Sequence, residues 1–438
     1  MRRIQVFIDK RRIGTLSEGS DLWAFEYEPG WAAAPDAFDL SPALPRGRQR
    51  HEDGSSNRPV QWYFDNLLPE EMLRETMARE AGIKDPMDAF AMLEYLGQES
   101  AGSLTLITPG QDLPEAGKVQ LLAEEDLSKR IAGLPRHTLT GSAPKRMSVA
   151  GAQHKLLVIY DGRRLYEPVG ATASTHILKP DHPNPDVYPA SVYNEYLTMR
   201  LAHAAGLQVP PVNMFYVPQP VYLIERFDRI HPKGSAPGQA RRQHIIDACQ
   251  LLNISRTYKH AGASLQSLAQ AAQLCAGKAA ARLGLFRWLV FNVLFANDDC
   301  HLKNLSFHVG PSGFNLAPHY DLLSTGAYHT RAIADQSGKW PDVPMAIALP
   351  GAATFGQVTE ASMRAAAGEL GVPETTARRV IAEVLSRTQA SLVKLAQEYE
   401  QARQLAPDAA RSALAAQSRV ADTISKIIYP GMSQALQR

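Results

Sequence analysis

The sequence predicts an α+β fold of two lobes, a mixed α/β N-terminal lobe followed by a mainly helical C-terminal lobe. Apolar and polar residues alternate near the N-terminus and in several later runs, as in strands with one buried face. Beyond the basic stretch 229–242 the pattern becomes mainly helical. We therefore expect the two lobes to divide after residue 228.

Residues 1–108 are expected to form a small α+β subdomain. Alternating apolar residues predict strands at residues 3–8, 12–17, 22–27 and 102–108. Residues 29–60 are rich in proline, glycine and charge, which favours a loop. A helix is expected from Phe64 to about Ala81, with Pro69 in its first turn, and another over residues 86–96.

Residues 109–228 are expected to complete this lobe with further strands. These strands are predicted at residues 156–160, 176–179, 212–217 and 221–226. Ser191–Ala205 carries apolar residues at helical spacing and is followed by Gly206, a residue suited to end a helix. Strands around one inserted helix are typical of a lobe that holds a nucleotide.

The C-terminal lobe, residues 229–438, is expected to contain one strongly apolar helix at Ala279–Ala296. This helix ends just before Asp299. A hairpin and then alanine-rich helices are expected at residues 305–309, 314–316 and 359–436. The hairpin delivers a further acidic residue, Asp321.

Composition places this chain of 438 residues among ordinary globular proteins. Its net charge of +2 gives the whole chain no strong attraction to nucleic acid or membrane. Its 3 scattered cysteines suit neither a disulfide framework nor a zinc site, which favours a reducing cytoplasm. No apolar run reaches the ~18 residues of a membrane span, and the N-terminus lacks the apolar core of a signal peptide.

Asp299, Asn304 and Asp321 form the most informative pattern. The first two have the spacing with which the catalytic loop of protein kinases places a base and a magnesium ligand. Asp321 follows where a kinase has its second magnesium ligand, and Mg²⁺ prefers such oxygen donors. The simpler interpretation is that these residues cap a helix and occupy turns, where Asp and Asn are common.

Neighbouring residues offer alternatives to this assignment. Asp298 could replace Asp299 as the base, but only Asp299 has the kinase-like spacing to Asn304. His301 could contact ribose or phosphate, or simply shape the loop, because Mg²⁺ prefers oxygen ligands. Asp298, His301 and His319 could also form a zinc or iron site, although they lack the spacing of common zinc motifs.

Three further segments fit a nucleotide site, and each has an ordinary alternative. Lys179 could hold ATP phosphates while paired with Glu195, or the two could be a surface pair. Residues 148–155 form a small-residue loop that could cradle phosphate with backbone N–H groups, or a plain turn. Glu225–Asp228 lies where a kinase binds adenine through its backbone, or is a simple strand end.

Taken together, these segments resemble the HipA family, the serine/threonine-kinase toxins of bacterial toxin–antitoxin pairs. The resemblance runs over nearly the whole chain, with the motifs in the same order. They are Phe64–Pro69, Gly97–Gly102, Ser148–Gln153, Thr175–Lys179, Asn194–Glu195, Glu225–Arg229, Asp299–Asn304 and Pro318–Asp321. Such a series is more specific than any single motif, and it implies a bilobal protein-kinase-like fold.

The resemblance implies a site for ATP and Mg²⁺. Asp299 would be the catalytic base, Asn304 and Asp321 would hold Mg²⁺, and Glu195 would form an ion pair with Lys179. Nucleotide contacts would come from Ala150, Gly151, Ala152, Gln153, His154, Lys155, Lys179, Glu225, Arg226, Phe227, Asp228, His301, Lys303, Asn304, Tyr320 and Asp321.

The resemblance also implies regulation and partners. Ser148 would be a site of inactivating autophosphorylation, because a phosphate there would repel ATP. The substrate would be an aminoacyl-tRNA synthetase, with glutamyl-tRNA synthetase the best-known target, so that phosphorylation stalls translation and leads to growth arrest and persistence. A small helix-turn-helix antitoxin of the HipB type would be the partner, and the toxin would join its dimer on operator DNA as co-repressor.

Two departures from the family pattern leave the choice of substrate open. His154 stands where the family often has Glu, and Cys300 stands where small residues such as Gly occur. Neither replaces the base or a metal ligand. Two other classes of function stay open: a catalytically weak, nucleotide-binding co-repressor, and a small-molecule phosphotransferase that shares the same carboxylate chemistry.

Overall fold

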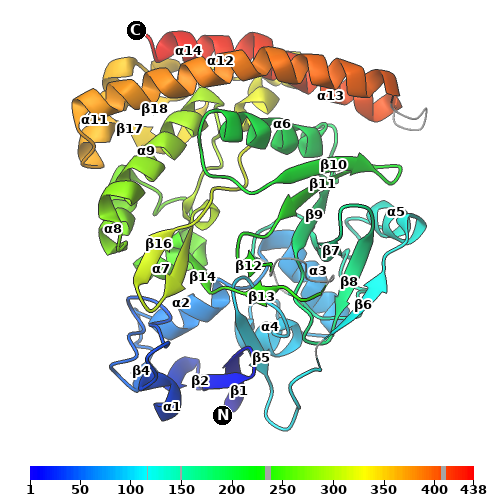
Figure 1. The fold of residues 1–438 in the computed structure, drawn as a ribbon, viewed down its shortest axis with the longest axis vertical. Helices are drawn as coiled ribbons and strands as arrows, with labels where there is room; N and C mark the ends of the chain where they lie inside the picture. The colour runs from blue at the N-terminus through cyan, green and yellow to red at the C-terminus, as the bar shows by residue number, and fades with distance from the viewer. Residues whose placement is uncertain (116, 148–149, 232–237, 406–410) are drawn as a thin grey trace. The chain divides into compact units, whose positions relative to one another are not determined.

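The computed structural model of the protein describes residues 1–115, 117–147, 150–231, 238–405 and 411–438. Its elements form two compact units, each assembled from segments that are distant in the sequence (Figure 1). The first unit contains Met1–Lys179, Ile224–Lys259 and Ser306–Ala317, and the second contains Pro180–Leu223, His260–Leu305 and Pro318–Arg438. The units are therefore interleaved along the chain, and they do not divide at residues 108 and 228.

The N-terminal sheet of the first unit is antiparallel, with the strand order β4-β3-β2-β1-β5. Its strands are β1 (Arg2–Ile8), β2 (Arg11–Gly19), β3 (Leu22–Tyr27), β4 (Arg50–Glu52) and β5 (Leu104–Ile107). Ile4 and Val6 are fully buried, so the alternation in the sequence marks the core face of β1. A Cβ at Gly14 would lie 2.4 Å from the ring of Phe25, which explains the glycine. The four strands expected in this part are confirmed.

Four helices accompany this sheet: α1 (Pro29–Ala32), α2 (Pro59–Asp65), α3 (Glu71–Ala81) and α4 (Ala89–Leu96). The expectation of one helix from Phe64 to Ala81 is wrong, because α2 and α3 are separate. Pro69 lies between them and forms an isolated parallel bridge with Gly151, so it does not occupy a helical first turn. The segment 29–60 is also not all loop, since α1, β4 and the start of α2 lie within it.

A second antiparallel sheet of the first unit contains neighbouring strands in the order β9-β7-β8-β6. The strands are β6 (Lys118–Leu121), β7 (Leu156–Tyr160), β8 (Leu165–Val169) and β9 (His176–Pro180). β7 and β9 confirm two predicted strands, and Leu178 pairs with Leu156 across them. β6 and α5 (Glu124–Ala132) were not expected, because β6 is exposed at every position and carries no core pattern.

The rest of the first unit contains a three-stranded antiparallel sheet in the order β14-β15-β16. Its elements are β12 (Arg229–Ile230), β13 (Arg241–Arg242), β14 (Ile245–Asp247), α7 (Ala248–Leu252), a 3₁₀ turn (Arg256–Tyr258), β15 (Ser306–Gly310) and β16 (Gly313–Leu316). The predicted hairpin after Asn304 is therefore confirmed. Asp247 and Gln250 form a reciprocal capping box that starts α7 at the end of β14.

The second unit is mainly helical. Its first elements are α6 (Ser191–Ala204), β10 (Val212–Tyr216), β11 (Pro220–Glu225, where the chain re-enters the first unit), α8 (Leu265–Leu274) and α9 (Lys278–Leu294). After the Asp299 loop come α10 (Arg331–Ala334), β17 (Pro344–Leu349), β18 (Ala352–Thr354), α11 (Glu360–Glu369), α12 (Glu374–Leu405), α13 (Arg411–Thr423), a π-helical turn (Ile424–Ile428) and α14 (Tyr429–Ala435).

The helices of the second unit follow their sequence signals. Gly206, which follows the C-cap residue Ala205 of α6, has φ +88°, as predicted for a residue that ends a helix. The long helix α12, orange in Figure 1, packs against α6 and α9. Among the described residues, no helix combines the length and apolar character that crossing a lipid bilayer requires.

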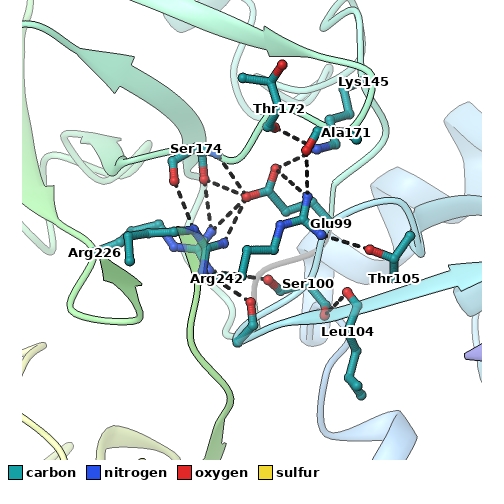
Figure 2. Close-up of polar contacts among 12 residues, drawn as sticks. Glu99, Ser100, Leu104, Thr105, Lys145, Ala171, Thr172, Ser174, Arg226 and Arg242 are labelled. Atoms are coloured by element: carbon teal, nitrogen blue, oxygen red, sulfur yellow. Dashed lines mark hydrogen bonds and ion pairs between the residues drawn. The ribbon is translucent and has the colours of Figure 1, made fainter. Parts of the chain in front are cut away.

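A buried ionic cluster within the first unit is centred on Glu99, which follows α4 (Figure 2). The Glu99 carboxylate accepts hydrogen bonds from Lys145 Nζ at 2.8 Å and Arg229 Nη2 at 2.9 Å. Arg226 Nη1 lies 3.5 Å from the same carboxylate, and Arg242 Nη2 lies 3.9 Å from it. Glu99 is therefore the common counter-ion of four cationic side chains.

Asp228 supplies the second carboxylate of this cluster. It accepts hydrogen bonds from the backbone N–H of Gly102 at 2.8 Å and from Arg226 Nη2 at 2.7 Å. The remaining N–H groups of the cations donate to hydroxyl and carbonyl oxygens, among them Thr172 O for Lys145 and Thr105 Oγ1 for Arg242. The excess of positive charge is thus distributed over many oxygen partners, as burial requires.

The pKa values in the cluster follow from burial and from these neighbours. Burial is the largest influence on Asp228 and raises its pKa, but Arg226 and Arg229 outweigh it and lower the value to about 2. The surrounding cations also hold the pKa of Glu99 well below its ordinary value, against the effect of burial. Burial lowers the pKa of Lys145 to about 8. The cluster is therefore ionised at neutral pH.

The cluster joins segments that the sequence analysis assigned to different tasks. Glu99 lies in the Gly97–Gly102 motif, Arg226 and Asp228 lie in the segment expected to bind adenine, and Lys145 precedes the expected phosphate loop. Because all these residues belong to one unit, the ionic contacts fix the backbone of these segments relative to one another.

We expect Glu99→Gln to destabilise the first unit. The substitution keeps the shape of the side chain but leaves Lys145 and three arginines with one carboxylate, and removing one partner of a buried ion pair costs about 3–5 kcal/mol. Thermal and urea denaturation would measure the loss. Glu374→Gln is the matched control, because Glu374 forms its ion pairs with Arg364 and Arg378 at the surface. Equal melting temperatures for the two variants would contradict this account.

We also expect the contribution of Asp228 to stability to depend on pH. Its pKa falls from 3.8 to about 2 on folding, so its stabilising effect is complete above about pH 4 and is lost as pH falls toward 2. The shift corresponds to about 2 kcal/mol. Urea midpoints of wild type and Asp228→Asn, measured from pH 7 downward, should converge below pH 4. The exposed Asp112→Asn should show no such convergence, and a constant gap for Asp228→Asn would refute the prediction.

Candidate active site

The loop that carries Asp299 begins where α9 ends and is held by side-chain hydrogen bonds within the second unit. Asn297 donates from Nδ2 to Asn292 Oδ1 at 2.7 Å, and its own Oδ1 accepts from the backbone N–H of Asp299 at 3.1 Å. Ala296 has φ +49°, a conformation unusual for alanine that turns the chain sharply out of the helix. The buried helix thus places the loop on a rigid base.

The structure distinguishes the two adjacent aspartates. Asp298 Oδ2 lies 3.0 Å from His329 Nε2, and this hydrogen bond raises the pKa of His329. The Asp299 side chain is 60% exposed, with Oδ1 lying 3.9 Å from Nε2 of both His260 and His301. Asp298 is therefore committed to a structural pair, whereas Asp299 presents its carboxylate to solvent. The geometry favours Asp299 as the residue that would meet a substrate.

Asn304 closes the loop back onto Asp299. It lies in a 3₁₀ turn (Leu302–Asn304) and donates from Nδ2 to the backbone carbonyl of Asp299 at 2.9 Å. Tyr320 donates from its hydroxyl to the carbonyl of Lys303 at 2.8 Å, which ties the segment before Asp321 to the same turn. The five-residue spacing between Asp299 and Asn304 is thus bridged by a hydrogen bond that closes the loop.

Asp321 has φ +58°, a strained conformation for a residue other than glycine that is found preferentially at functional sites. The carboxylates of Asp321 and of Glu195, on α6, both act on the buried hydroxyl of Tyr222. Burial first, and then these two carboxylates, raise the pKa of Tyr222 well above its ordinary value. Within the second unit, two expected site residues therefore influence the same buried hydroxyl.

The donor set fits Mg²⁺. The Asn304 amide nitrogen donates to Asp299, so its Oδ1 is the side-chain atom that can coordinate a cation. Asp321 adds a carboxylate in the same unit, and hard cations prefer such oxygen ligands.

The alternative zinc or iron set of Asp298, His301 and His319 is not assembled. His319 is buried beside Trp288, with ring centroids 6.3 Å apart, and burial lowers its pKa to about 4. Among the residues that the structure describes, the group of potential ligands within 4.8 Å of one another is His260, Asp299 and His301. His260 was missed by sequence reasoning because it lies in a separate loop and matches no spacing rule.

The expected phosphate loop, residues 150–155, belongs to the first unit, and a hydrogen bond joins its first and last residues. Lys155 donates from Nζ to the carbonyl of Ala150 at 2.8 Å, and Gly151 has φ +111°. The positive φ favours glycine here, whereas the amine, which would lie 2.9 Å from a Cβ at this position, ends a flexible side chain that can move away. Of the other loop residues, His154 is buried, whereas Ala152 is exposed and Gln153 partly so. Ser148 lies outside the described residues.

The segment expected to bind adenine follows β11. Glu225 Oε1 lies 3.7 Å from His231 Nε2, and the Phe227 ring packs edge-on against His308 with centroids 5.8 Å apart. The side chains of Arg226 and Asp228 are occupied in the Glu99 cluster, so only their backbone could contact a nucleotide. The role of this segment stays a prediction.

The two residues of the remaining predicted ion pair, Lys179 and Glu195, belong to different units. Lys179 is buried on β9 of the first unit, and Glu195 is buried on α6 of the second. Each lies on the kind of element that the sequence predicted. Their ion pair stays a prediction.

Comparison with known proteins agrees with these features. Residues 4–107 match the family described as HipA N-terminal domain, and residues 147–392 match HipA-like C-terminal domain. The chain is 31% identical over 347 residues to the serine/threonine-protein kinase toxin HipA of Shewanella oneidensis, covering 74% of this chain and 76% of that protein. It is 32% identical over 412 residues to a putative kinase, Y4mE, of Sinorhizobium fredii, covering 91% and 93%.

A solved structure extends the similarity to the fold. The HipA chain of the Shewanella oneidensis complex of HipA, HipB and operator DNA superimposes with a TM-score of 0.76 and 25% identity, covering 99% of both chains. The N-terminal and C-terminal family matches, the curated relatives and this fold agree over most of the sequence. We conclude that the chain belongs to the HipA family and has its kinase-like α+β fold.

Proposed function

We propose that this protein is an ATP- and Mg²⁺-dependent kinase that phosphorylates serine or threonine hydroxyls of a protein. The observation that supports this most strongly is the Asp299 loop. It combines an exposed carboxylate with an asparagine amide that is oriented by the same loop, and Asp321 lies in the same unit. A phosphoryl-transfer site needs these residue types, a base for the hydroxyl proton and oxygen ligands for Mg²⁺.

The residues of the loop would divide the reaction between them. Asp299 would accept the proton of the substrate hydroxyl as the hydroxyl oxygen attacks the γ-phosphorus and the bond to the β-phosphate oxygen of ATP breaks. Asn304 and Asp321 would hold Mg²⁺, which neutralises charge on the phosphates when bound. The hydrogen bonds to Asn297 and Asn304 would keep the base in place without a cost of reorganisation.

ATP would be held mainly by the first unit. Lys179, paired with Glu195, would contact phosphate, residues 150–155 would cover the phosphates, and the backbone of Glu225–Phe227 would bind adenine. The catalytic loop would add contacts through His301, Lys303 and Tyr320. These assignments rest on the family resemblance and on the position of each residue on its predicted element.

The family relatives suggest the cellular role. We propose that the protein is the toxin of a toxin–antitoxin pair, that it phosphorylates an aminoacyl-tRNA synthetase such as glutamyl-tRNA synthetase, and that it thereby arrests growth in the cytoplasm and promotes persistence. A HipB-type helix-turn-helix antitoxin dimer would neutralise it and bind operator DNA with it as a repressor. The Shewanella oneidensis complex contains HipA, HipB and operator DNA, which supports this partnership.

Asp299→Asn should abolish phosphoryl transfer while leaving ATP binding intact. Loss of the base should lower the rate at least ~10²-fold. The assay is incubation with ATP and Mg²⁺ followed by intact mass measurement and peptide mapping, with one phosphoryl group expected at Ser148 of the wild type. Asp298→Asn is the matched control, because that carboxylate pairs with His329 and should be dispensable for the chemical step.

The same assay separates the proposed kinase from its alternatives. Wild type that binds ATP but transfers no phosphate to itself or to lysate proteins would favour a catalytically weak co-repressor. Transfer to sugars or aminoglycosides instead would indicate a small-molecule phosphotransferase. Equal rates for Asp299→Asn and wild type would remove Asp299 from the mechanism.

Asn304→Ala and Asp321→Asn should weaken metal-dependent nucleotide binding. Each removes one oxygen ligand, so the Mg²⁺ concentration that gives half-maximal ATP binding should rise at least ~10-fold. Calorimetric titration at several Mg²⁺ concentrations measures this. Asn315→Ala, an exposed position of β16, serves as the control. If ATP binding without Mg²⁺ fell to the same extent, the two residues would be structural rather than metal ligands.

A further inference from the structure

We propose that His260, Asp299 and His301 form a binding site for a divalent transition-metal ion such as Zn²⁺, and that occupation of this site inhibits phosphoryl transfer. The three side chains lie in the second unit, and one potential ligand atom from each lies within 4.8 Å of the others. The inhibitory consequence rests on the proposed function of Asp299 as a base. The binding site itself does not.

The geometry is close to that of a metal centre with three protein ligands. Nε2 of His260 and Nε2 of His301 each lie 3.9 Å from Asp299 Oδ1. Ligand bonds of about 2.0–2.2 Å around tetrahedral Zn²⁺ place ligand atoms roughly 3.3 Å apart. The two separations between nitrogen and oxygen must therefore shorten by about 0.6 Å, and the separation between the two imidazole ligand atoms, at most 4.8 Å, by no more than about 1.5 Å.

The three residues differ in exposure in a way that suits metal capture. His301 is 8% exposed, whereas His260 and Asp299 are 55% and 60% exposed. The imidazoles of His260 and His301 meet edge to face at 83°, with centroids 4.6 Å apart. A fixed buried ligand and two solvent-facing ligands give an ion a direct path of entry.

The backbone maintains the spacing of the ligands. The N–H of His301 donates to the carbonyl of Asp299 at 2.9 Å, and Asn304 donates to the same carbonyl. His260 starts a turn in which the N–H of Ala263 donates to its carbonyl at 3.0 Å. The site is therefore built from two ordered turns.

The chemistry of the donors distinguishes this site from that of Mg²⁺. Two imidazole nitrogens and one carboxylate suit Zn²⁺ and similar ions, whereas Mg²⁺ prefers oxygen ligands throughout. Three protein ligands leave a coordination position open for water. An ion bound here would draw electron density from the Asp299 carboxylate, which could then no longer accept the proton of a substrate hydroxyl.

The first test is metal binding by the full chain without nucleotide, with Zn²⁺ in calorimetry and Co²⁺ as a spectroscopic probe. Wild type should bind one equivalent, with a visible Co²⁺ absorption band of low coordination number. His260→Gln should weaken binding at least ~10-fold, because it removes a direct ligand. The matched control is His203→Gln, an exposed histidine of α6 in the same unit, which should bind as wild type does.

The outcomes separate this site from the proposed kinase activity. Equal metal affinity of wild type and His260→Gln, or no Co²⁺ band, would overturn the site even in an active kinase. In the active protein, Zn²⁺ should suppress phosphorylation of the wild type, a chelator should restore it, and His260→Gln should resist. Binding without this suppression would overturn the inhibition and keep the site. An inactive protein that still binds Zn²⁺ through His260 would contradict the proposed kinase alone.

Discussion

The burial of Glu99 among four cations is the interaction on which the first unit depends. Without it, Lys145 would have no carboxylate partner among the described residues and the three arginines would share Asp228, and an uncompensated charge in the protein interior costs several kcal/mol. The cluster also lies between segments with different expected tasks. Its ionic contacts hold Arg226 and Asp228 of the segment expected to bind adenine, and they hold Lys145, in fixed positions within the first unit.

In the second unit, the exposed carboxylate of Asp299 stands on a backbone that side-chain hydrogen bonds hold. Asn297 and Asn304 hold the main chain of Asp299 from both sides, while its side chain stays exposed. The neighbouring Asp298 contributes to the framework through Thr325 and His329 instead. Two adjacent identical residues thus have separate roles because one backbone turn directs them to different surroundings.

Much of this architecture could be predicted from the sequence. Alternation identified β1, β2 and β3, and the apolar run identified α9, because burial on one face leaves a periodic trace. The loop of Asp299 and Asn304 followed from spacing, since its hydrogen bonds close over a few residues. The break between α2 and α3 could not be predicted, because Pro69 pairs with the distant Gly151. The contacts of Glu99 and His260 likewise depend on residues far away in sequence.

The Glu99 cluster also links the two family segments of this chain. The two matched family segments, residues 4–107 and 147–392, contribute opposite charges to one buried network: Glu99 comes from the first, and Arg226 and Arg229 from the second. A gene that lost the N-terminal segment would encode a C-terminal segment with buried arginines short of a counter-ion. The charge pairing therefore makes the stability of the C-terminal segment depend on the N-terminal one, although each has its own sequence signature.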